Sequence, residues 1–154
     1  MEDSISKIDR SYYDNGQVKS ISTIKKGILD GPFEEYYDDG QLRIIGSYKQ
    51  GFPDGPFESF YKDGQLEVKE NYKDGVLEGL CETYHKNGQL DSRVNFTKGN
   101  PDGTQEKYYK NGQLRSKANY KDGVLDGVAE SYYENGNSKS KGYFKNNEFY
   151  SGTL

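Results

Sequence analysis

The sequence predicts an all-β fold, an elongated single-layer antiparallel β-meander of about six stacked β-hairpin repeats of 24 residues. The first observation is that the stretch Tyr-Tyr-Lys-Asn-Gly-Gln-Leu, which begins at Tyr108, recurs with small changes every 24 residues. Its six copies begin at Tyr12, Tyr36, Phe60, Tyr84, Tyr108 and Tyr132. The second observation is that each copy contains Asn-Gly or Asp-Gly, the strongest short-range signal for a hairpin. Thirdly, the runs between turns are about 8–11 residues long and lack helical periodicity, as expected for strands.

The composition is unusual for a folded protein, because 31% of the residues are hydrophobic and 30% are charged. Such values alone would suggest disorder. However, the 15 Tyr and 7 Phe residues recur at fixed positions of the repeat. An aromatic side chain buries a large area and tolerates a solvated edge, which suits a thin sheet. We therefore expect a folded chain with a shallow core that extends along the repeats.

The repeat also defines the domain organisation. Residues 1–11 match it poorly and are interpreted as an N-terminal cap that can include one extra strand, since the end of an array has to shield an open edge. No linker interrupts residues 12–154, which are expected to form a single repeat domain. Its units are 12–35, 36–59, 60–83, 84–107, 108–131 and 132–154. In the last unit Asn146-Asn147 replaces Asp-Gly, so this degraded unit is interpreted as a C-terminal cap.

The turns predict which side chains share a face. A type I′ turn at Asn111-Gly112 would have positive φ at both residues and would set Tyr109 opposite Leu114. One face then collects the aromatic at repeat position 2, the leucine at position 7 and the aromatic at position 13, and we expect this face to be the core. The glycine at position 20 should lie opposite the position-13 aromatic, whose ring would cover the bare backbone. The position-13 aromatics are Tyr48, Tyr72, Phe96, Tyr120 and Phe144.

The opposite face is expected to combine the position-1 aromatics with a glutamate at position 23 of five units. The same register sets these glutamates opposite basic residues, in the pairs Glu58–Lys69, Glu82–Arg93, Glu106–Lys117 and Glu130–Lys141. Tyr36 is expected to face Arg43, and Tyr108 to face Arg115, as cation–π pairs. Tyrosine and arginine are enriched at the energetic centres of protein interfaces. The predicted protein-binding residues are therefore Tyr36, Arg43, Glu58, Phe60, Lys69, Glu82, Tyr84, Arg93, Tyr108 and Arg115.

Charge and chain composition restrict the partners and the location. The formal net charge is −4, which argues against nucleic acid and against an anionic membrane surface as partners. No apolar run approaches the length of a membrane-spanning helix, and the first residues lack the apolar core of a signal peptide. We therefore expect a cytoplasmic protein, although a chain trimmed of its signal peptide would look the same.

Catalysis is not expected, because an active site needs unlike polar groups that converge and this chain repeats similar ones. His85 occupies position 2, where other units have tyrosine, and is interpreted as an aromatic substitute. Cys81, the single cysteine, replaces Phe33 and Phe57 at position 22 and is interpreted as a small buried hydrophobe. Blocks such as Lys73-Asp74-Gly75 lack the alternating oxygen ligands of a calcium loop, so they are interpreted as turns. No cofactor and no metal is expected.

The repeat Tyr-Tyr-x-Asn-Gly-Gln-Leu, followed by aromatic-Lys-Asp-Gly-x-Leu-Asp-Gly, resembles the bacterial variant of the MORN repeat over residues 12–145. The resemblance implies hairpins stacked into a twisted single-layer sheet, with no shared catalytic residues. Many bacterial proteins of this variant are classed with antitoxins or immunity partners of secreted toxins. Similar eukaryotic proteins are linked to scaffolding, to dimerisation and to acidic lipids.

The leading hypothesis is a non-enzymatic protein–protein interaction module that binds or neutralises a partner such as a toxin. An acidic protein would suit a basic partner, for example a nuclease. The alternative is a structural protein that self-associates through the open edges of its sheet. A membrane-surface scaffold is a third hypothesis, which the acidic charge disfavours.

Overall fold

The computed structural model describes residues 5–153, which form sixteen β-strands and no helix. All strand pairs are antiparallel, so the predicted all-β class and the hairpin repeat are confirmed. The chain forms two compact units, a first half that ends at Val76 and a second half that begins at Leu77. Four residues of the predicted N-terminal cap, 1–4, and the last residue of the predicted C-terminal cap lie outside the described residues.

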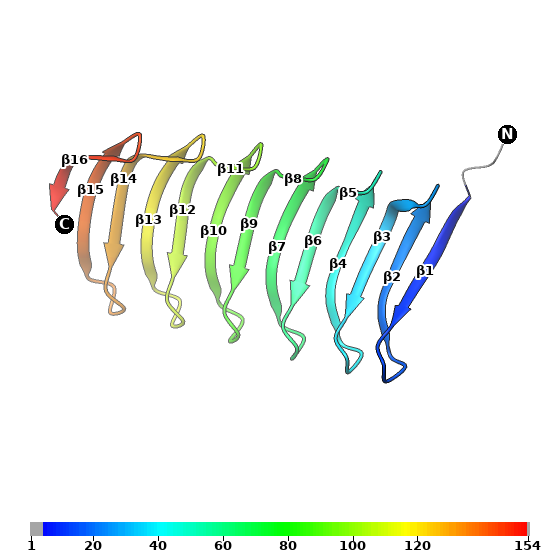
Figure 1. Cartoon of the computed structure of the whole chain (residues 1–154). Helices are drawn as coiled ribbons and strands as arrows, with labels where there is room; N and C mark the ends of the chain where they lie inside the picture. The colour runs from blue at the N-terminus through cyan, green and yellow to red at the C-terminus, as the bar shows by residue number, and fades with distance from the viewer. Residues whose placement is uncertain (1–4, 154) are drawn as a thin grey trace. The chain divides into compact units, whose positions relative to one another are not determined.

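In the first half the strands lie side by side in chain order (Figure 1). They are β1 (Ser6–Tyr12), β2 (Val18–Lys25), β3 (Ile28–Tyr36), β4 (Leu42–Lys49), β5 (Phe52–Pro53), β6 (Gly55–Phe60) and β7 (Leu66–Lys73). The sheet order is β1-β2-β3-β4-β6-β7, and the short β5 pairs with β4. Strand β1 lies in the segment interpreted as a cap, except for Tyr12, and all seven of its residues are exposed. Strand β8 (Val76–Leu77) lies at the division between the halves.

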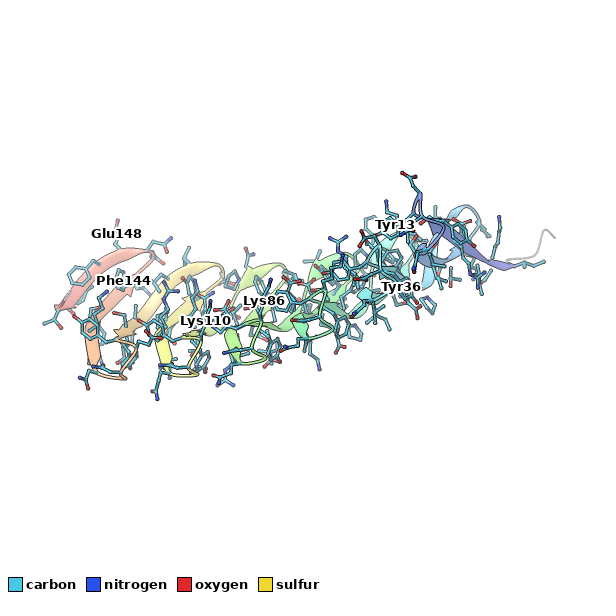
Figure 2. The ribbon with its side chains drawn as sticks, turned by 90° about the horizontal axis from the view of Figure 1, so that it is seen from below. Tyr13, Tyr36, Lys86, Lys110, Phe144 and Glu148 are labelled. Carbon is cyan, nitrogen blue, oxygen red and sulfur yellow. The ribbon has the colours of Figure 1, made fainter. Side chains whose placement is uncertain are left out.

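The second half has the order β9-β10-β12-β13-β14-β15-β16, with β11 paired to β10. The strands are β9 (Gly79–Tyr84), β10 (Leu90–Thr97), β11 (Asn100–Pro101), β12 (Gly103–Tyr108), β13 (Leu114–Lys121), β14 (Val124–Tyr132), β15 (Ser138–Lys145) and β16 (Glu148–Thr153). Within each half, side chains project from both faces of a single layer of backbone (Figure 2). Residues 5–153 include no helix long and apolar enough to cross a membrane.

The Asn-Gly turns differ from the prediction. At Asn111-Gly112 only the glycine has positive φ, at +82°. The Gly112 N–H donates to the Tyr109 carbonyl (2.8 Å), and the Tyr109 N–H donates to the Gln113 carbonyl (2.8 Å), so residues 110–112 form a three-residue loop. The Asn111 Oδ1 accepts the Gln113 N–H at 2.9 Å. This local side-chain bond stabilises a turn in which asparagine keeps negative φ, so the predicted two-residue type I′ turn is wrong here.

The two-residue turns are instead at the other end of the hairpins, at repeat positions 15 and 16 (Figure 1). Lys26 and Gly27 have φ of 51° and 81°, as a type I′ turn requires. In the last hairpin Asn146 and Asn147 adopt φ of 51° and 68°. Asparagine tolerates this left-handed region, so the degraded unit keeps its turn.

A β-bulge follows each Asn-Gly loop and restores the predicted register. Tyr108 pairs with Leu114, but the preceding Lys107 pairs with Ser116, so Arg115 is an extra residue. The loop is one residue longer than predicted, and the bulge adds one residue to the second strand. All strand pairs beyond the bulge therefore have the predicted partners, and the glutamates lie opposite the predicted basic residues. Next to the loop the prediction fails, because Leu114 lies opposite Tyr108 rather than Tyr109 and shares the face of the position-1 aromatics.

The core of the first half is a row of four aromatic rings. Phe33, Tyr48, Phe57 and Tyr72 contact one another edge to face, with ring centroids 5.3, 5.5 and 5.4 Å apart. Phe57 is the most buried of the four, with 8% of its surface exposed. In the second half Val94 is buried. Cys81, which was predicted to be buried, lies opposite Val94 and is only half-buried.

The predicted pairing of position-20 glycines with position-13 aromatics is confirmed, for example Gly55 with Tyr72. The predicted reason is wrong, because an added Cβ at Gly55 would meet nothing within 4 Å. Gly55 instead has φ of +93°, which favours glycine. One glycine that a ring does cover is Gly46, where an added Cβ would lie 2.5 Å from the ring of Phe57.

Neighbouring hairpins are joined at both ends by bonds that repeat along the chain. The Tyr37 hydroxyl donates to the Phe60 carbonyl (2.8 Å), and His85 Nε2 lies 3.1 Å from the Tyr108 carbonyl in the corresponding position. His85 thus takes the place of tyrosine as an aromatic ring, as predicted, and its Nε2 also lies within hydrogen-bonding distance of the equivalent carbonyl. At the other end, the Gly51 N–H donates to the Leu29 carbonyl at 2.7 Å.

Candidate protein-binding surfaces

The predicted binding face carries the position-23 glutamates and the position-1 aromatics, and it is called the glutamate face in each half. In the first half, the Tyr36 hydroxyl donates to the carboxylate of Glu34. Lys69 Nζ lies 3.6 Å from Glu58 Oε1, with about half of the lysine side chain exposed. Phe60 lies on the same face, opposite Leu66.

In the second half, each position-1 tyrosine donates its hydroxyl to the glutamate two residues earlier. These bonds are Tyr84–Glu82 (3.0 Å), Tyr108–Glu106 (2.9 Å) and Tyr132–Glu130 (2.9 Å). Arg93 pairs in register with both Glu82 and Glu106, and its Nε lies 2.6 Å from Glu106 Oε2. The salt bridge therefore joins Arg93 to the next hairpin.

These contacts shift the acidity of the groups involved. Burial raises the pKa of Glu106, but the hydrogen bonds from Arg93 and Tyr108 outweigh burial and leave that pKa below its ordinary value of 4.5. The bonds from Lys141 and Tyr132 lower the pKa of Glu130 in the same way. Burial and the bond to Glu106 raise the pKa of Tyr108.

We expect stability to fall in acid because of these two glutamates. A carboxylate whose pKa is lowered in the folded state adds stability above its unfolded pKa of about 4.5, and this contribution is lost as the pH falls through the lower folded value. Replacing Arg93 with alanine should reduce the fall in unfolding free energy between pH 5 and pH 3 by less than about 1 kcal/mol, since the pair is partly exposed. Urea unfolding at each pH measures the fall. Arg115→Ala, which removes a cation on the opposite face of the sheet from Glu106, should leave the fall unchanged; an equal reduction would contradict the assignment.

Two of the predicted site residues lie on the opposite face. Arg43 and Arg115 are the bulge residues, and their guanidinium groups lie over the rings of Tyr37 and Tyr109, each 5.9 Å from the ring centroid. The predicted cation–π pairs of Arg43 with Tyr36 and of Arg115 with Tyr108 are therefore wrong. The physical reason is the extra residue of the bulge, which points to the other side of the sheet. We call this second side the ring face.

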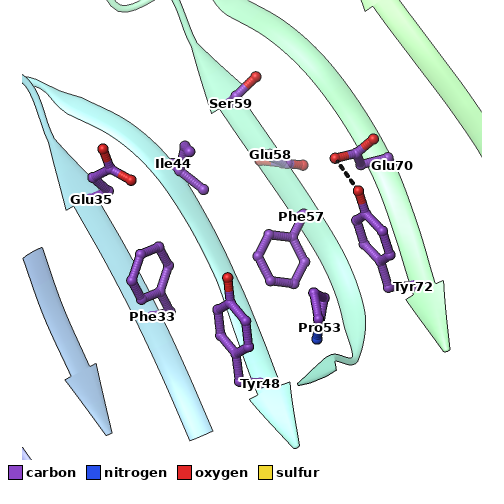
Figure 3. A pocket seen from close by; sticks show the side chains of 10 residues that line it. All are labelled: Phe33, Glu35, Ile44, Tyr48, Pro53, Phe57, Glu58, Ser59, Glu70 and Tyr72. Atoms are coloured by element: carbon purple, nitrogen blue, oxygen red, sulfur yellow. Dashed lines mark hydrogen bonds between the residues drawn. The ribbon is translucent and has the colours of Figure 1, made fainter. Parts of the chain in front are cut away.

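The ring face of the first half contains a groove of about 230 Å³ (Figure 3). The four core rings line it, together with the carboxylates of Glu35 and Glu70. Glu70 accepts a hydrogen bond from the Tyr72 hydroxyl at 2.9 Å, and Glu35 pairs with Arg43 at 2.5 Å. Aromatic faces beside carboxylates are a favourable environment for a cation.

Sequence reasoning missed this groove, because Glu35 and Glu70 were not distinguished from the many other acidic residues. The spacing of Phe33 and Phe57 by one repeat was the signal that could have indicated an aromatic row between them. Within residues 5–153, His, Cys, Asp and Glu side chains form no group of three that could hold a metal ion.

Antiparallel hairpins that recur at a fixed period and pack only against their neighbours define a β-hairpin repeat protein. The MORN repeat variant matches six segments, residues 10–26, 29–50, 53–74, 77–98, 101–122 and 125–146, and the chain belongs to this family. Repeats of this family generally mediate interactions with proteins or membranes. No curated protein matches the chain.

Two solved structures contain chains with similar segments. One is a GtfA/B complex bound to UDP and GlcNAc, with 14% identity over 92% of this chain and 24% of that chain, and a TM-score of 0.28. The other contains accessory secretory proteins 1, 2 and 3 of Streptococcus pneumoniae, with 17% identity over 80% of this chain and 18% of that chain, and a TM-score of 0.23. The chain thus spans a quarter or less of the length of those chains.

Proposed function

We propose that this protein is a non-enzymatic module that binds a basic partner protein and, as a bacterial antitoxin or immunity protein, neutralises it. The observation that carries this proposal is the groove of the first half. It combines four aromatic rings with the carboxylates of Glu35 and Glu70, which is a suitable environment for a lysine or arginine side chain of the partner.

The charge of the first half supports a basic partner. Residues 1–76 contain ten Lys and Arg against fifteen Asp and Glu, whereas residues 77–154 contain eleven against ten. The excess of negative charge therefore belongs to the half that contains the groove. Complementary charge accelerates association and helps to exclude wrong partners.

The glutamate face is the second contact surface in this proposal. It presents Tyr84, Arg93 and Tyr108 in one half, and Tyr36, Phe60 and Lys69 in the other. Its carboxylates already accept bonds from tyrosine hydroxyls, which holds the aromatic rings and basic groups in fixed positions. A partner that binds this face would meet a preorganised surface.

The test uses tagged full-length protein in a native lysate of its host at physiological salt. We expect one stoichiometric partner whose toxic activity, for example nuclease activity, is lost in the complex. Replacing Glu35 and Glu70 with glutamine should weaken binding of the purified partner at least tenfold. The triple variant Tyr84→Ala, Arg93→Ala, Tyr108→Ala should also weaken binding of the partner. The size of this loss measures how much the glutamate face contributes to the binding free energy.

The matched control removes two carboxylates from the second half, by Asp122→Asn and Glu148→Gln. It should bind as the unmodified protein does, because neither residue lines the groove. Binding that is equally sensitive to this control would indicate a general charge effect. Unchanged binding in both the groove variant and the triple variant, with each variant folded, would overturn the proposal.

Self-association is the second candidate function, and the edge strands favour it. Among residues 5–153, strand β1 pairs only with β2, and it exposes Ile8 with 57% of its surface accessible. At the other end of the chain, Tyr150 of β16 is 82% exposed. An unpaired strand edge of this kind can pair with a second copy. Light scattering over a concentration series should give a constant monomer mass for a pure binding module and a rising mass for a self-assembling protein.

A further inference from the structure

The ring face of the second half contains a pocket of about 330 Å³ whose chemistry is the reverse of the groove described above. Its side chains are basic, hydroxylic and aromatic, and no aspartate or glutamate of the described residues lines it. The lining residues used below are Lys107, Tyr109, Arg115, Ser116, Ser131 and Lys139.

Strand pairing brings these residues together. Lys107 on β12 lies opposite Ser116 on β13, which lies opposite Ser131 on β14. Adjacent strands are about 4.8 Å apart, so the three side chains originate within about 10 Å of one another. Arg115 and Lys139 are bulge residues at the same ends of β13 and β15, and they add two cations beside this row.

Aromatic rings hold the bulge cations in place. The guanidinium of Arg115 lies 5.9 Å from the ring centroid of Tyr109, and the amine of Lys139 lies 5.7 Å from that of Tyr133. The Tyr109 hydroxyl donates to the Tyr132 carbonyl at 2.8 Å. That carbonyl oxygen is therefore already hydrogen-bonded, which lessens its repulsion of an anion in the pocket.

The charges of the pocket are not neutralised locally. Lys141 and Lys145, on the same hairpin, form salt bridges with Glu130 and Asp126. In contrast, Lys107, Arg115 and Lys139 form no salt bridge with any carboxylate in the part of the chain that the structure describes.

The repeat itself does not require these cations. Three repeats earlier, Glu35 and Glu67 stand where Lys107 and Lys139 stand here, and of these two glutamates Glu35 lines the acidic groove. The arginine and the tyrosine are kept as Arg43 and Tyr37. The same backbone thus supports opposite charge in the two halves, so the basic pocket needs an explanation other than folding.

We propose that this pocket binds a phosphate monoester group. Three cations and two serine hydroxyls can donate to several oxygens of one dianion, whereas a single carboxylate offers two oxygens and one charge. A phosphorylated group carries roughly −1.5 to −2 charges at neutral pH, which matches this set of donors. The site is in the other half of the chain and has the opposite charge from the groove for a basic partner, so it does not rest on that function.

The test is a titration of the full chain with inorganic phosphate, at constant ionic strength and pH 7.5, followed by amide NMR shifts. Shifts should saturate and should concentrate on the strands around Lys107, Ser116 and Ser131. The double variant Lys107→Glu, Lys139→Glu introduces the residues that the first half has at these positions, and it should weaken phosphate binding at least tenfold. Lys107→Gln with Lys139→Gln should weaken it less, and this milder variant serves if the double glutamate variant is unfolded by circular dichroism.

The matched control is Lys110→Glu with Lys121→Glu, which changes the net charge equally at exposed lysines outside the pocket. It should bind phosphate as the unmodified protein does. A second arm uses phosphatidylcholine vesicles with and without phosphatidic acid. If the protein binds vesicles that contain phosphatidic acid but not inorganic phosphate, and the Lys107 and Lys139 variant loses this binding, the same site is supported. A lipid is then identified as the source of the phosphate group. No binding in either arm, or equal loss in the control, would overturn the proposal.

Discussion

Replacing Phe57 with alanine is expected to lower the free energy of unfolding by about 3 kcal/mol. Phe57 is 8% exposed and contacts the rings of Tyr48 and Tyr72 edge to face, at centroid distances of 5.5 and 5.4 Å. Its removal takes away the ring contacts with Tyr48 and Tyr72 and leaves a cavity in the middle of the row. The value lies at the lower end of the range for phenylalanine, because the core of a single layer is open to water on one side.

Equilibrium urea unfolding measures this loss, with intrinsic tyrosine fluorescence as the signal. Phe52→Ala is the matched control, since Phe52 is in strand β5 of the same half and is 59% exposed. It should change the unfolding free energy by less than about 0.5 kcal/mol. Similar losses in the two variants would show that the row of rings is not the core of this half.

Replacing Gly46 with alanine is expected to lower the unfolding free energy by about 1–3 kcal/mol, through overpacking. An added Cβ would lie 2.5 Å from the ring of Phe57, closer than such atoms can approach. The ring is fixed between its two neighbours, so it has little freedom to move away. The loss should appear as a lower urea midpoint with an unchanged slope.

The sign of this effect should reverse when Phe57 is absent. Gly46 is not among the residues with positive φ, so alanine fits its backbone. In the Phe57→Ala background the clash disappears, and Gly46→Ala should stabilise the protein by about 0.4–1 kcal/mol because it restricts the unfolded chain. A double-mutant cycle measures this coupling. If Gly46→Ala destabilised both backgrounds equally, its cost would come from the backbone and not from the ring.

The fold class and most of the register could be predicted from the sequence because the repeat position of each residue is visible. The pairs Glu58–Lys69 and Glu106–Lys117 and the position-20 glycines opposite aromatics followed from turn spacing alone. The local turn geometry could not be predicted. The Asn-Gly dipeptide favours two loop types, and the choice depends on whether the asparagine side chain bonds to the backbone, as Asn111 does to the Gln113 N–H.

The candidate site was predicted less completely than the fold. Tyr84, Arg93 and Tyr108 share the predicted face, since strand alternation determines their direction once the register is known. Arg43 and Arg115 lie on the other face, because each is the extra residue of a β-bulge that was not predicted. A shift of one residue along a strand moves a side chain to the opposite face of the sheet. The groove and the basic pocket were missed for a different reason. Each depends on charges in neighbouring hairpins that converge only after folding.

The loop of three residues and the bulge that follows it have a consequence for protein engineering. Each alone would displace the downstream strand by one residue, and only together do they keep every later side chain on its own face. The seven residues Tyr109–Arg115 therefore form one structural unit that has to be transferred as a whole. If the Asn-Gly loop were transplanted into another hairpin protein without its arginine, the strand after the loop would shift by one residue. The side chains of that strand would then change faces, and polar groups would point into the core of the host protein. Transplanting all seven residues would leave the amphipathic pattern of the host intact.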